Sequence, residues 1–492
     1  MNPTAEQQTA LDNFTAGHQA IAIQAGAGTG KTTTIVELAR STKAKGVYTA
    51  FNKSIVTDVE AKVPANIEAR TTHSLAYRAV GHRSRSRLSA PRMRSDKIAR
   101  LLDLRPFNVP GLDGKPKVIQ PGFQGSLAMR AIANFCNSDD AAPGPRHVPF
   151  VEGVDAHGTY ANNDAISKAI AAVLPTVWAD LMAEDGRLPY KHDVYVKAWE
   201  LGKPRIAADF ILLDEAQDTA PVMASILRKQ RGTQIVMVGD SAQAIYDWRG
   251  AVDAFSYLGA DVTSYLTQSF RFGPAIANVA NLILGNLGTD LRMKGLDSIA
   301  SSIDIVDDPD AILTRTNGQA MKLVLEAQRQ GRRPYLMGGG EAIASFARAV
   351  VDLENGKRPM HADLACFDSW AEVVDYTTND PQGDELALMV KLVEDYGTDV
   401  ILEAVGRMPR TEDGCDLVVS TAHKAKGREW DTVQLAGDFA RKTDELGNVR
   451  PASEADLRLL YVAATRAKLV LDPYGSDLVV ELLANQEATA TA

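Results

Sequence analysis

The sequence has few cysteines, no long apolar run and no N-terminal targeting pattern. Its 492 residues include three cysteines, Cys136, Cys366 and Cys415, which lie far apart and form neither a disulfide framework nor a zinc ligand set. No stretch of 18 or more apolar residues is present, and residues 1–6 lack the basic start of a secretory signal. We therefore expect no membrane segment and a reducing cytoplasm, bacterial or that of a virus-infected host, with the nucleus left open.

The composition is that of a globular protein with a sizeable core. Hydrophobic residues make up 45% and charged residues 23%, which excludes disorder as the main state. At about 150 residues per domain, the length predicts roughly three domains. The net charge is −9, yet residues 70–117 hold 12 Lys/Arg and 3 Asp/Glu. This basic block is either a phosphate-binding face or a solvated surface.

Short, continuous apolar runs that end in polar or glycine-rich loops recur along the chain. Such runs are typical of strands buried on both faces of a parallel sheet, and helical patterns such as 32–40 follow several of them. The pattern predicts an α/β protein. The expected strands are 20–25, 46–51, 210–213 and 235–238 in the first half, and 303–306, 311–314, 335–337, 417–420, 433–436 and 469–471 in the second.

Changes in amino-acid composition divide the chain into segments. Proline- and glycine-rich loops separate helical stretches such as 166–182, and a helical, acidic stretch interrupts the second half. We expect a first α/β unit from 1–82 and 204–265, interrupted by a helical insertion at 83–203. A second unit would comprise 266–340 and 414–484, interrupted by a reduced insertion at 341–413, with a disordered tail at 485–492. We find no short repeat.

A phosphate-binding loop follows the first expected strand and opens a helix. Glycines there let backbone N–H groups surround phosphate oxygens, and the helix N-terminus adds a favourable dipole. Lys31 would reach the β- and γ-phosphates of ATP, and the Thr32 hydroxyl would bind Mg²⁺. Ala25 takes the place of the first glycine of the strict pattern. The expected nucleotide-binding residues are Ala25, Gly26, Ala27, Gly28, Thr29, Gly30, Lys31, Thr32 and Thr33.

Two adjacent carboxylates end the strand expected at 210–213. Asp214 is placed to hold Mg²⁺, together with Thr32, and Glu215 to polarise an attacking water. A solvated acidic turn is the alternative, which the phosphate loop makes weaker. A third strand runs into residues 239–251, GDSAQAIYDWRGA.

Together, AGAGTGKT, DEAQD and VGDSAQAIYDWRGA resemble motifs I, II and III of superfamily 1 helicases of the UvrD/Rep type. The remaining motifs follow in order, at 2–8, 49–53, 71–75, 266–272, 312–317, 419–431 and 459–468. Within the family, the motif sequences most resemble those in the helicase core of eukaryotic F-box DNA helicases, although no F-box is expected here. The resemblance implies two RecA-like P-loop NTPase lobes with helical insertion subdomains.

The resemblance assigns roles at the nucleotide. Gln7 would read adenine, Gln243 would sense the γ-phosphate, and Glu429 would contact the ribose. Arg271 and Arg466 resemble the two arginine fingers of the family, supplied by the second lobe. Ser269 and Phe270 differ from the usual Asn-Tyr, and Arg428 and Trp430 from the usual Leu and Phe. These departures leave every catalytic group in place.

The resemblance also implies a grip on single-stranded DNA and on junctions of single- and double-stranded DNA. Backbone contacts and sequence-tolerant stacking hold single strands, and the basic block is a further contact. Movement would be 3′→5′. Trp248 is the leading candidate for stacking, with core packing as its alternative. The expected DNA contacts are Phe51, Asn52, Thr72, His73, Tyr246, Trp248, Arg249, His423 and Lys424.

The sequence favours an ATP-driven DNA helicase. Two alternatives stay open: a translocase that strips proteins and unwinds poorly, which the reduced second insertion favours, and a DNA-binding scaffold without ATP turnover, which the intact catalytic set opposes. We expect no nuclease domain, because about 20 residues follow the last motif. DNA and RNA are not distinguished. Protein partners, oligomeric state and a place in replication, repair or recombination are not indicated.

Overall fold

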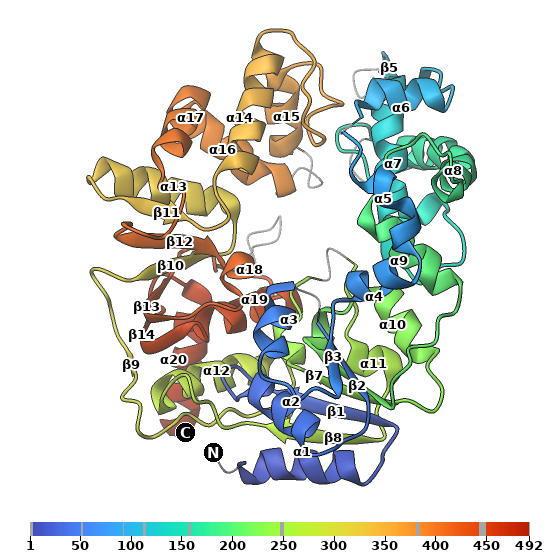
Figure 1. The fold of residues 1–492 in the computed structure, drawn as a ribbon. Helices are drawn as coiled ribbons and strands as arrows, with labels where there is room; N and C mark the ends of the chain where they lie inside the picture. The colour runs from blue at the N-terminus through green and yellow to red at the C-terminus, as the bar shows by residue number, and fades with distance from the viewer. Residues whose placement is uncertain are drawn as a thin grey trace.

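The computed structural model describes residues 3–50, 53–91, 93–111, 115–155, 159–246, 250–379, 384–441 and 449–491. The described chain forms two six-stranded parallel sheets flanked by helices, each with a helical insertion (Figure 1). The α/β class and the two RecA-like lobes expected from the sequence are confirmed.

The first lobe is built on a sheet with the strand order β3-β2-β6-β7-β1-β8. Its central strands are almost wholly buried, as their unbroken apolar sequences predict. Because all its strands are parallel, the loops after β1, β6 and β7 meet at one edge. The strands are β1 Ala20–Ala25, β2 Gly46–Thr49, β3 Ile67–Ala69, β6 Phe210–Asp214, β7 Gln234–Gly239 and β8 Val262–Leu266; the helices are α1 Ala5–Thr15, α2 Lys31–Arg40, α3 Lys53–Glu60, α4 Thr72–Ala79, α10 Pro221–Arg228 and α11 Ala254–Leu258.

The second lobe repeats this architecture, with the strand order β11-β12-β10-β13-β14-β9. Its core includes seven of the eleven residues of α19, which packs between the two lobes. The strands are β9 Ser302–Ile303, β10 Ala311–Thr314, β11 Pro334–Leu336, β12 Leu417–Thr421, β13 Trp430–Leu435 and β14 Ala467–Asp472; the helices are α12 Pro274–Asn286, α13 Asn317–Arg329, α18 Ala422–Ala425, α19 Glu454–Ala464 and α20 Asp477–Thr491.

The two insertions rise on the same side of the lobes (Figure 1). The first contains α5 Arg85–Leu88, α6 Ser95–Leu101, the antiparallel hairpin β4 Phe107–Pro110 and β5 Pro116–Ile119, α7 Pro121–Asn137, α8 Ala161–Met182 and α9 His192–Leu201. The second contains α14 Glu341–Glu354, α15 Trp370–Asn379, α16 Asp384–Tyr396 and α17 Thr398–Arg407.

The tips of the insertions touch each other. Lys117 of the first forms an ion pair with Glu372 of the second, with Nζ and Oε1 3.0 Å apart. Tyr376 donates a hydrogen bond to Glu152. The Phe367 ring lies so close to Gly153 that an added Cβ would come within 2.6 Å of it. The insertions are therefore joined at their tips as well as through the lobes.

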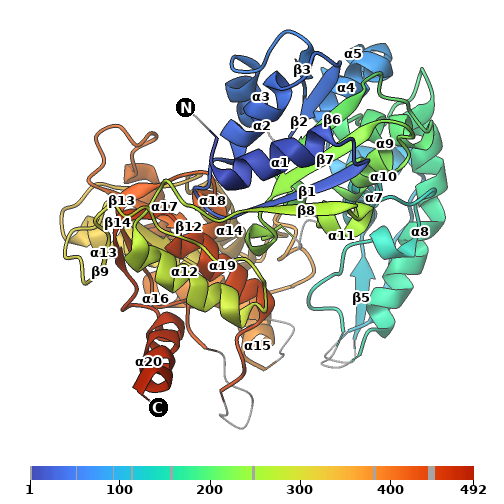
Figure 2. The same cartoon turned by 90° about the horizontal axis from the view of Figure 1, so that it is seen from below.

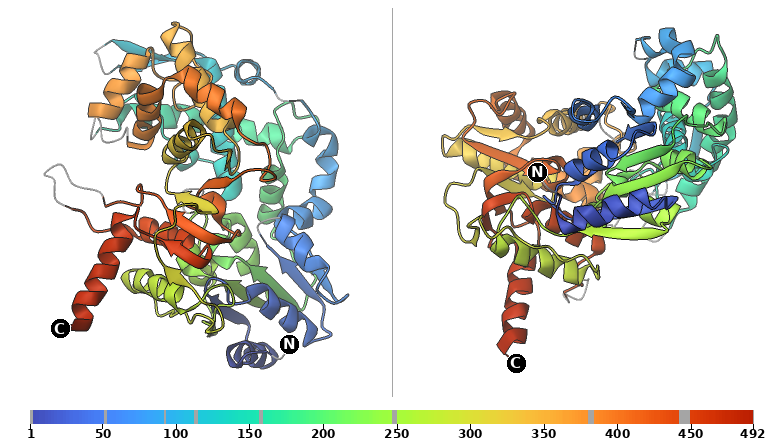
Figure 3. Two further views of the ribbon diagram at one scale, coloured as in Figure 1. Left: turned by 90° about the vertical axis from the view of Figure 1, so that its left-hand side faces the viewer. Right: turned by 60° about the horizontal axis from the view of Figure 1, so that its bottom comes forward.

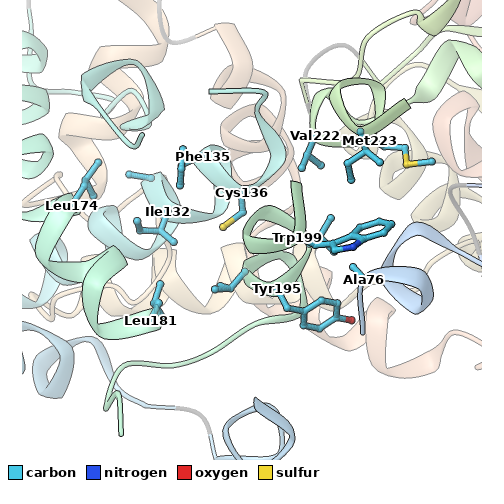
Figure 4. Packing of buried hydrophobic residues seen from close by; sticks show 14 of the residues in the cluster. Ala76, Ile132, Phe135, Cys136, Leu174, Leu181, Tyr195, Trp199, Val222 and Met223 are labelled. Atoms are coloured by element: carbon cyan, nitrogen blue, oxygen red, sulfur yellow. The ribbon is translucent and has the colours of Figure 1, made fainter. Parts of the chain in front are cut away.

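Helix α8 is, among the described residues, the one helix long and apolar enough to cross a membrane by length and composition. Its stripe of Ile166, Ile170, Leu174, Val177 and Leu181 faces the core of the first insertion. Figure 4 shows Leu174 and Leu181 in this cluster, near Phe135 and Ile132. This apolar stripe of α8 thus packs into the core, while 28% of its apolar window as a whole is buried.

Four strands and the chain end differ from the sequence expectation. The hairpin β4–β5 lies where the sequence analysis expected only loops and helices. The strands β3 and β8 were not predicted, because β3 has three residues and β8 alternates buried and exposed side chains at a sheet edge. The expected disordered tail falls largely within α20, which runs to Thr491 and projects from the second lobe (Figures 2 and 3).

Replacing Phe135 by alanine should destabilise the first insertion. The ring is 0% exposed, and its centroid lies 5.0 Å from that of Trp178. The loss of this packing should lower the unfolding free energy by about 3–5 kcal/mol. Thermal unfolding followed by circular dichroism measures it. Phe150→Ala is the matched control, because Phe150 is 43% exposed; equal losses in the two variants would contradict the described core.

Candidate active site between the lobes

The loop after β1 has the backbone of a phosphate cradle. Gly28 and Gly30 have φ values of +74° and +81°, in the left-handed region that favours glycine. A Cβ on Gly28 would come within 2.6 Å of Arg271 Cβ. Gly30 begins α2 without a side-chain cap in this described loop, so the first N–H groups of the helix are left for a ligand.

The other predicted loop residues support this conformation. Ala25 is the last residue of β1, so the missing first glycine costs nothing in extended backbone. The Thr29 hydroxyl donates to the Gly26 carbonyl over 2.9 Å. Ala27 is buried in the same loop, while Thr32 is half-buried and Thr33 exposed on α2.

Gln7 lies in α1 beside this loop. Its side chain completes a capping box with Thr4, and Nε2 donates to Thr34 Oγ1 over 3.2 Å. Both ends of the amide therefore contact the protein. A Cβ on Gly30 would lie 3.5 Å from Gln7 Nε2, so Gln7 is adjacent to the phosphate loop.

The two carboxylates at the end of β6 occupy different environments. Asp214 is 3% exposed and accepts a hydrogen bond from the Tyr48 hydroxyl over 2.7 Å. Glu215 has a φ of +52°. Its Oε1 lies 3.7 Å from Lys31 Nζ. The strained backbone thus directs Glu215 towards the phosphate loop while Asp214 stays against the sheet.

Burial and neighbouring charges shift the pKa values of these two carboxylates in opposite directions. Burial and the adjacent Glu215 raise the pKa of Asp214, against the hydrogen bond from Tyr48. Burial alone would raise the pKa of Glu215, but Lys31 and Lys426 outweigh it and lower that pKa. Glu215 is therefore held as a carboxylate next to Lys31.

The loop after β7 connects both lobes through hydrogen bonds. Gln243 Nε2 donates to Asp240 Oδ2 over 2.6 Å. From α19, the Tyr461 hydroxyl donates to Asp240 Oδ2 over 3.2 Å. The same hydroxyl accepts the Ala27 N–H over 3.3 Å. Tyr461 thus ties the phosphate loop and the β7 loop to the second lobe.

The two predicted arginines lie in the cleft. Arg466 is 2% exposed, and its Nη2 donates to Gln243 Oε1 over 3.4 Å. Burial, with Arg271 nearby, lowers the pKa of Arg466 to about 9. Arg271 Nε donates to Glu429 Oε2 over 2.7 Å. Arg271 Nη1 donates to the Thr465 carbonyl over 3.0 Å.

A cleft of about 210 Å³ brings these groups together. Eight of the predicted site residues line it, from both lobes. Asp218 and Lys426 also line it, although sequence analysis assigned them no role; both lie inside recognised motifs, but spacing alone does not show that they would pair. The lining residues are Ala27, Gly28, Lys31, Ile55, Glu215, Asp218, Gln243, Tyr246, Arg271, Lys426, Gly427 and Arg466.

The residues present fit a Mg²⁺-bound nucleotide. Mg²⁺ is usually held by one or two carboxylates plus substrate phosphates and keeps several waters, so no dedicated cage is needed. Within the described residues, no group of three or more His, Cys, Asp or Glu is placed to hold a metal. Thr32 and Asp214, beside the uncapped start of α2, supply the type of oxygen ligand this arrangement requires.

Two predicted DNA contacts, Tyr246 and His423, also form hydrogen bonds between the lobes. The Tyr246 hydroxyl donates to the His423 carbonyl over 3.1 Å. His423 Nε2 lies 3.1 Å from the Ile245 carbonyl oxygen. Lys424 is exposed, and its Nζ donates to Asn317 Oδ1 over 3.3 Å.

The remaining predicted DNA contacts lie on α4 or outside the described residues. Thr72 opens α4, and His73 Nε2 lies 3.0 Å from Asp193 Oδ1 on α9. Both line a second cavity, of about 220 Å³, which Asp214 and Glu215 also line. The predictions for Phe51, Asn52, Trp248 and Arg249 concern residues outside those that the structure describes.

The fold and the site define a two-lobed P-loop NTPase, with the phosphate loop on one lobe and arginines from the other. Residues 7–249 match the AAA domain family, and residues 416–471 match the UvrD-like helicase C-terminal domain family. The resemblance to superfamily 1 helicases of the UvrD/Rep type is therefore confirmed, and the chain is placed in that family.

Curated relatives agree with this placement. F-box DNA helicase protein 1 of Schizosaccharomyces pombe is 30% identical over 94% of this chain and 56% of its own length. F-box DNA helicase 1 of Gallus gallus is 29% identical over 95% of this chain and 48% of its own length. ATP-dependent DNA helicase UvrD2 of Mycobacterium tuberculosis is 26% identical over 53% of this chain and 46% of its own length. The chain thus spans about half the length of these relatives.

Gly28→Ala should abolish nucleotide binding. The added methyl would meet Arg271 and Ser269 at the phosphate loop. Gly17→Ala is the matched control, since Gly17 also has a positive φ, +82°, but nothing lies within 4 Å of its Cβ position. Both variants lose about 1–2 kcal/mol of stability from the backbone. Fluorescent ATP-analogue titration measures binding; equal affinities in the two variants would contradict the cradle.

Proposed function

We propose that the protein is an ATP-dependent DNA helicase or translocase that moves 3′→5′ along single-stranded DNA. The observation that carries this proposal is the cleft in which Lys31 and Glu215 of the first lobe face Arg271 and Arg466 of the second. A nucleotide bound there touches both lobes, so its binding and hydrolysis change how the lobes sit against each other. The helicase names of the relatives support DNA as the substrate.

The chemistry follows from the charges in the cleft. Lys31 binds the phosphates of ATP, and ionised Glu215 orients and polarises the attacking water. Gln243 lies between Asp240 and Arg466, so it relays the state of the terminal phosphate to the second lobe. Arg271 and Arg466 neutralise transition-state charge, an effect worth about 10³–10⁵ in rate for an arginine finger. Thr32 and Asp214 would hold Mg²⁺, which when bound would supply Lewis-acid stabilisation of the phosphates.

Movement requires that the lobes hold DNA differently when closed and when open. A predicted DNA contact follows a residue of the nucleotide site closely in the chain. Tyr246 follows Gln243 by three residues, and it is bonded to His423 of the second lobe. A change at the nucleotide is therefore passed to the DNA-facing loops over a short, packed path. The 3′→5′ direction and the preference for junctions follow from the family resemblance.

A translocase that strips proteins but unwinds little is the second candidate. The second insertion is small, with four helices among its described residues, and its tip contacts the first insertion through Lys117 and Glu372. An insertion engaged in this way offers less surface for duplex DNA. Unwinding and translocation must therefore be measured separately.

ATP hydrolysis should be stimulated strongly by oligo-dT and abolished by Lys31→Ala, because that substitution removes the cation that binds the phosphates. Phosphate release is the readout. Lys168→Ala, at an exposed position of α8, is the control and should match the wild type. Folded wild-type protein that binds DNA but hydrolyses no ATP would refute the enzyme and leave a DNA-binding scaffold.

Partial duplexes with a single-stranded tail at either the 3′ or the 5′ end test polarity. We expect strand displacement, or streptavidin removal from a biotinylated end, only when the tail allows 3′→5′ movement. Displacement of streptavidin without duplex unwinding would select the second candidate. Equal activity on both tails would contradict directional movement, and a matched RNA tail tests the choice between DNA and RNA.

A further inference from the structure

Asp218 stands between two cavities. It lines the nucleotide cleft together with Lys31 and Arg466, and it lines the second cavity together with Thr72 and His73. The residue is 5% exposed and lies in the short helical turn after Glu215. Asp218 is therefore in contact with both the nucleotide cleft and the second cavity.

The two carboxylate oxygens of Asp218 have different surroundings. Oδ2 forms a hydrogen-bonded ion pair with Lys426 Nζ, across the lobe boundary. Oδ1 is buried and, within the described residues, has no hydrogen-bond partner. The pairing with Lys426 is therefore the main compensation for burying this carboxylate.

Lys426 is held at four points of the first lobe, one of them the Tyr246 ring, whose centroid lies 5.5 Å from Nζ. Besides the bond to Asp218, its ammonium donates to the Gln243 carbonyl over 2.9 Å and lies 3.7 Å from Glu215 Oε2. Its side chain is 11% exposed. A cation from the second lobe thus sits beside the carboxylate that would orient the attacking water.

We propose that Asp218 is a positioning residue that holds Lys426 of the second lobe against Glu215 and Gln243, so that lobe contact is coupled to hydrolysis. This inference rests on the proposed ATPase function. Without Asp218, the flexible lysine side chain would keep a carbonyl, a more distant carboxylate and the Tyr246 ring, and closing the lobes would no longer place its charge reliably.

Alternative roles fit the geometry less well. A purely structural carboxylate would be satisfied within its own lobe, whereas the ion-pair partner of Asp218 comes from the other lobe. A metal ligand would not be paired with an ammonium group. The position of Asp218 is also separate from Asp214, whose oxygens are engaged by Tyr48 and by the Glu215 N–H.

A double-mutant cycle on DNA-stimulated ATP hydrolysis tests the proposal. Asp218→Asn should lower kcat about 10-fold, the scale of one charge-assisted hydrogen bond, and change KM for ATP by less than about 3-fold. Asp218→Glu, which keeps the charge, should recover part of the loss. Because Asp218 acts through Lys426, the double variant D218N/K426M should be no slower than K426M, within about 2-fold. Asp290→Asn, at an exposed position, is the control.

An unchanged kcat in D218N, or effects that multiply in the double variant, would overturn the proposal. A second readout does not depend on hydrolysis: acylation of lysines, read by mass spectrometry, in folded wild type and D218N. Labelling of Lys426 should rise several-fold in D218N while exposed Lys43 stays constant; unchanged Lys426 labelling would refute the contact. Wild-type protein inactive towards ATP would instead contradict the proposed function and leave the labelling arm decisive for Asp218.

Discussion

Charged residues of both lobes become buried against each other at the boundary between the lobes. The rest of the structure depends on these contacts. Glu215 lies 3.7 Å from Lys31 of its own lobe and 3.7 Å from Lys426 of the other. Arg466 is almost completely buried beside Gln243. A buried charge without a partner is costly, so each lobe supplies the counter-charges of its neighbour. A bound nucleotide is itself highly charged, so it must change the ion pairs between the lobes. Nucleotide binding therefore changes how the lobes are held together.

Rigid supports surround this charged boundary. Tyr461 of α19 contacts both the phosphate loop and Asp240, so it fixes the position of the second lobe against two loops of the first. At the base of the first insertion, Lys197 and Glu200 are buried and paired, with Nζ and Oε2 2.9 Å apart, and the Ser225 hydroxyl of α10 donates to the same carboxylate over 2.7 Å. This network fastens the insertion to the lobe that carries Asp214 and Glu215. Lobe motion would therefore carry the first insertion along with its lobe.

Much of the fold was predictable because most of its strands are unbroken apolar runs and its phosphate loop departs from the strict pattern only at Ala25. Strands β3 and β8 were not predictable, since a three-residue strand and an alternating edge strand lack that signal. In the site, local motifs identified Lys31 and Glu215, and the family resemblance identified Arg271 and Arg466. The ion pair of Asp218 with Lys426 needed coordinates, because 208 residues separate the two. Glu429, which was expected to contact the ribose, accepts a hydrogen bond from Arg271. The sequence alone does not show which partner Glu429 has.

The distance between the lobes during the nucleotide cycle tests the central claim most directly. Dyes attached at Lys43→Cys of the first lobe and Lys322→Cys of the second, both exposed positions, report it by fluorescence energy transfer. With single-stranded DNA bound, the account predicts one distance without nucleotide, a different one with a non-hydrolysable ATP analogue, and a return with ADP. It also predicts that Arg466→Ala suppresses the change. A distance that is the same in all three states would contradict the account.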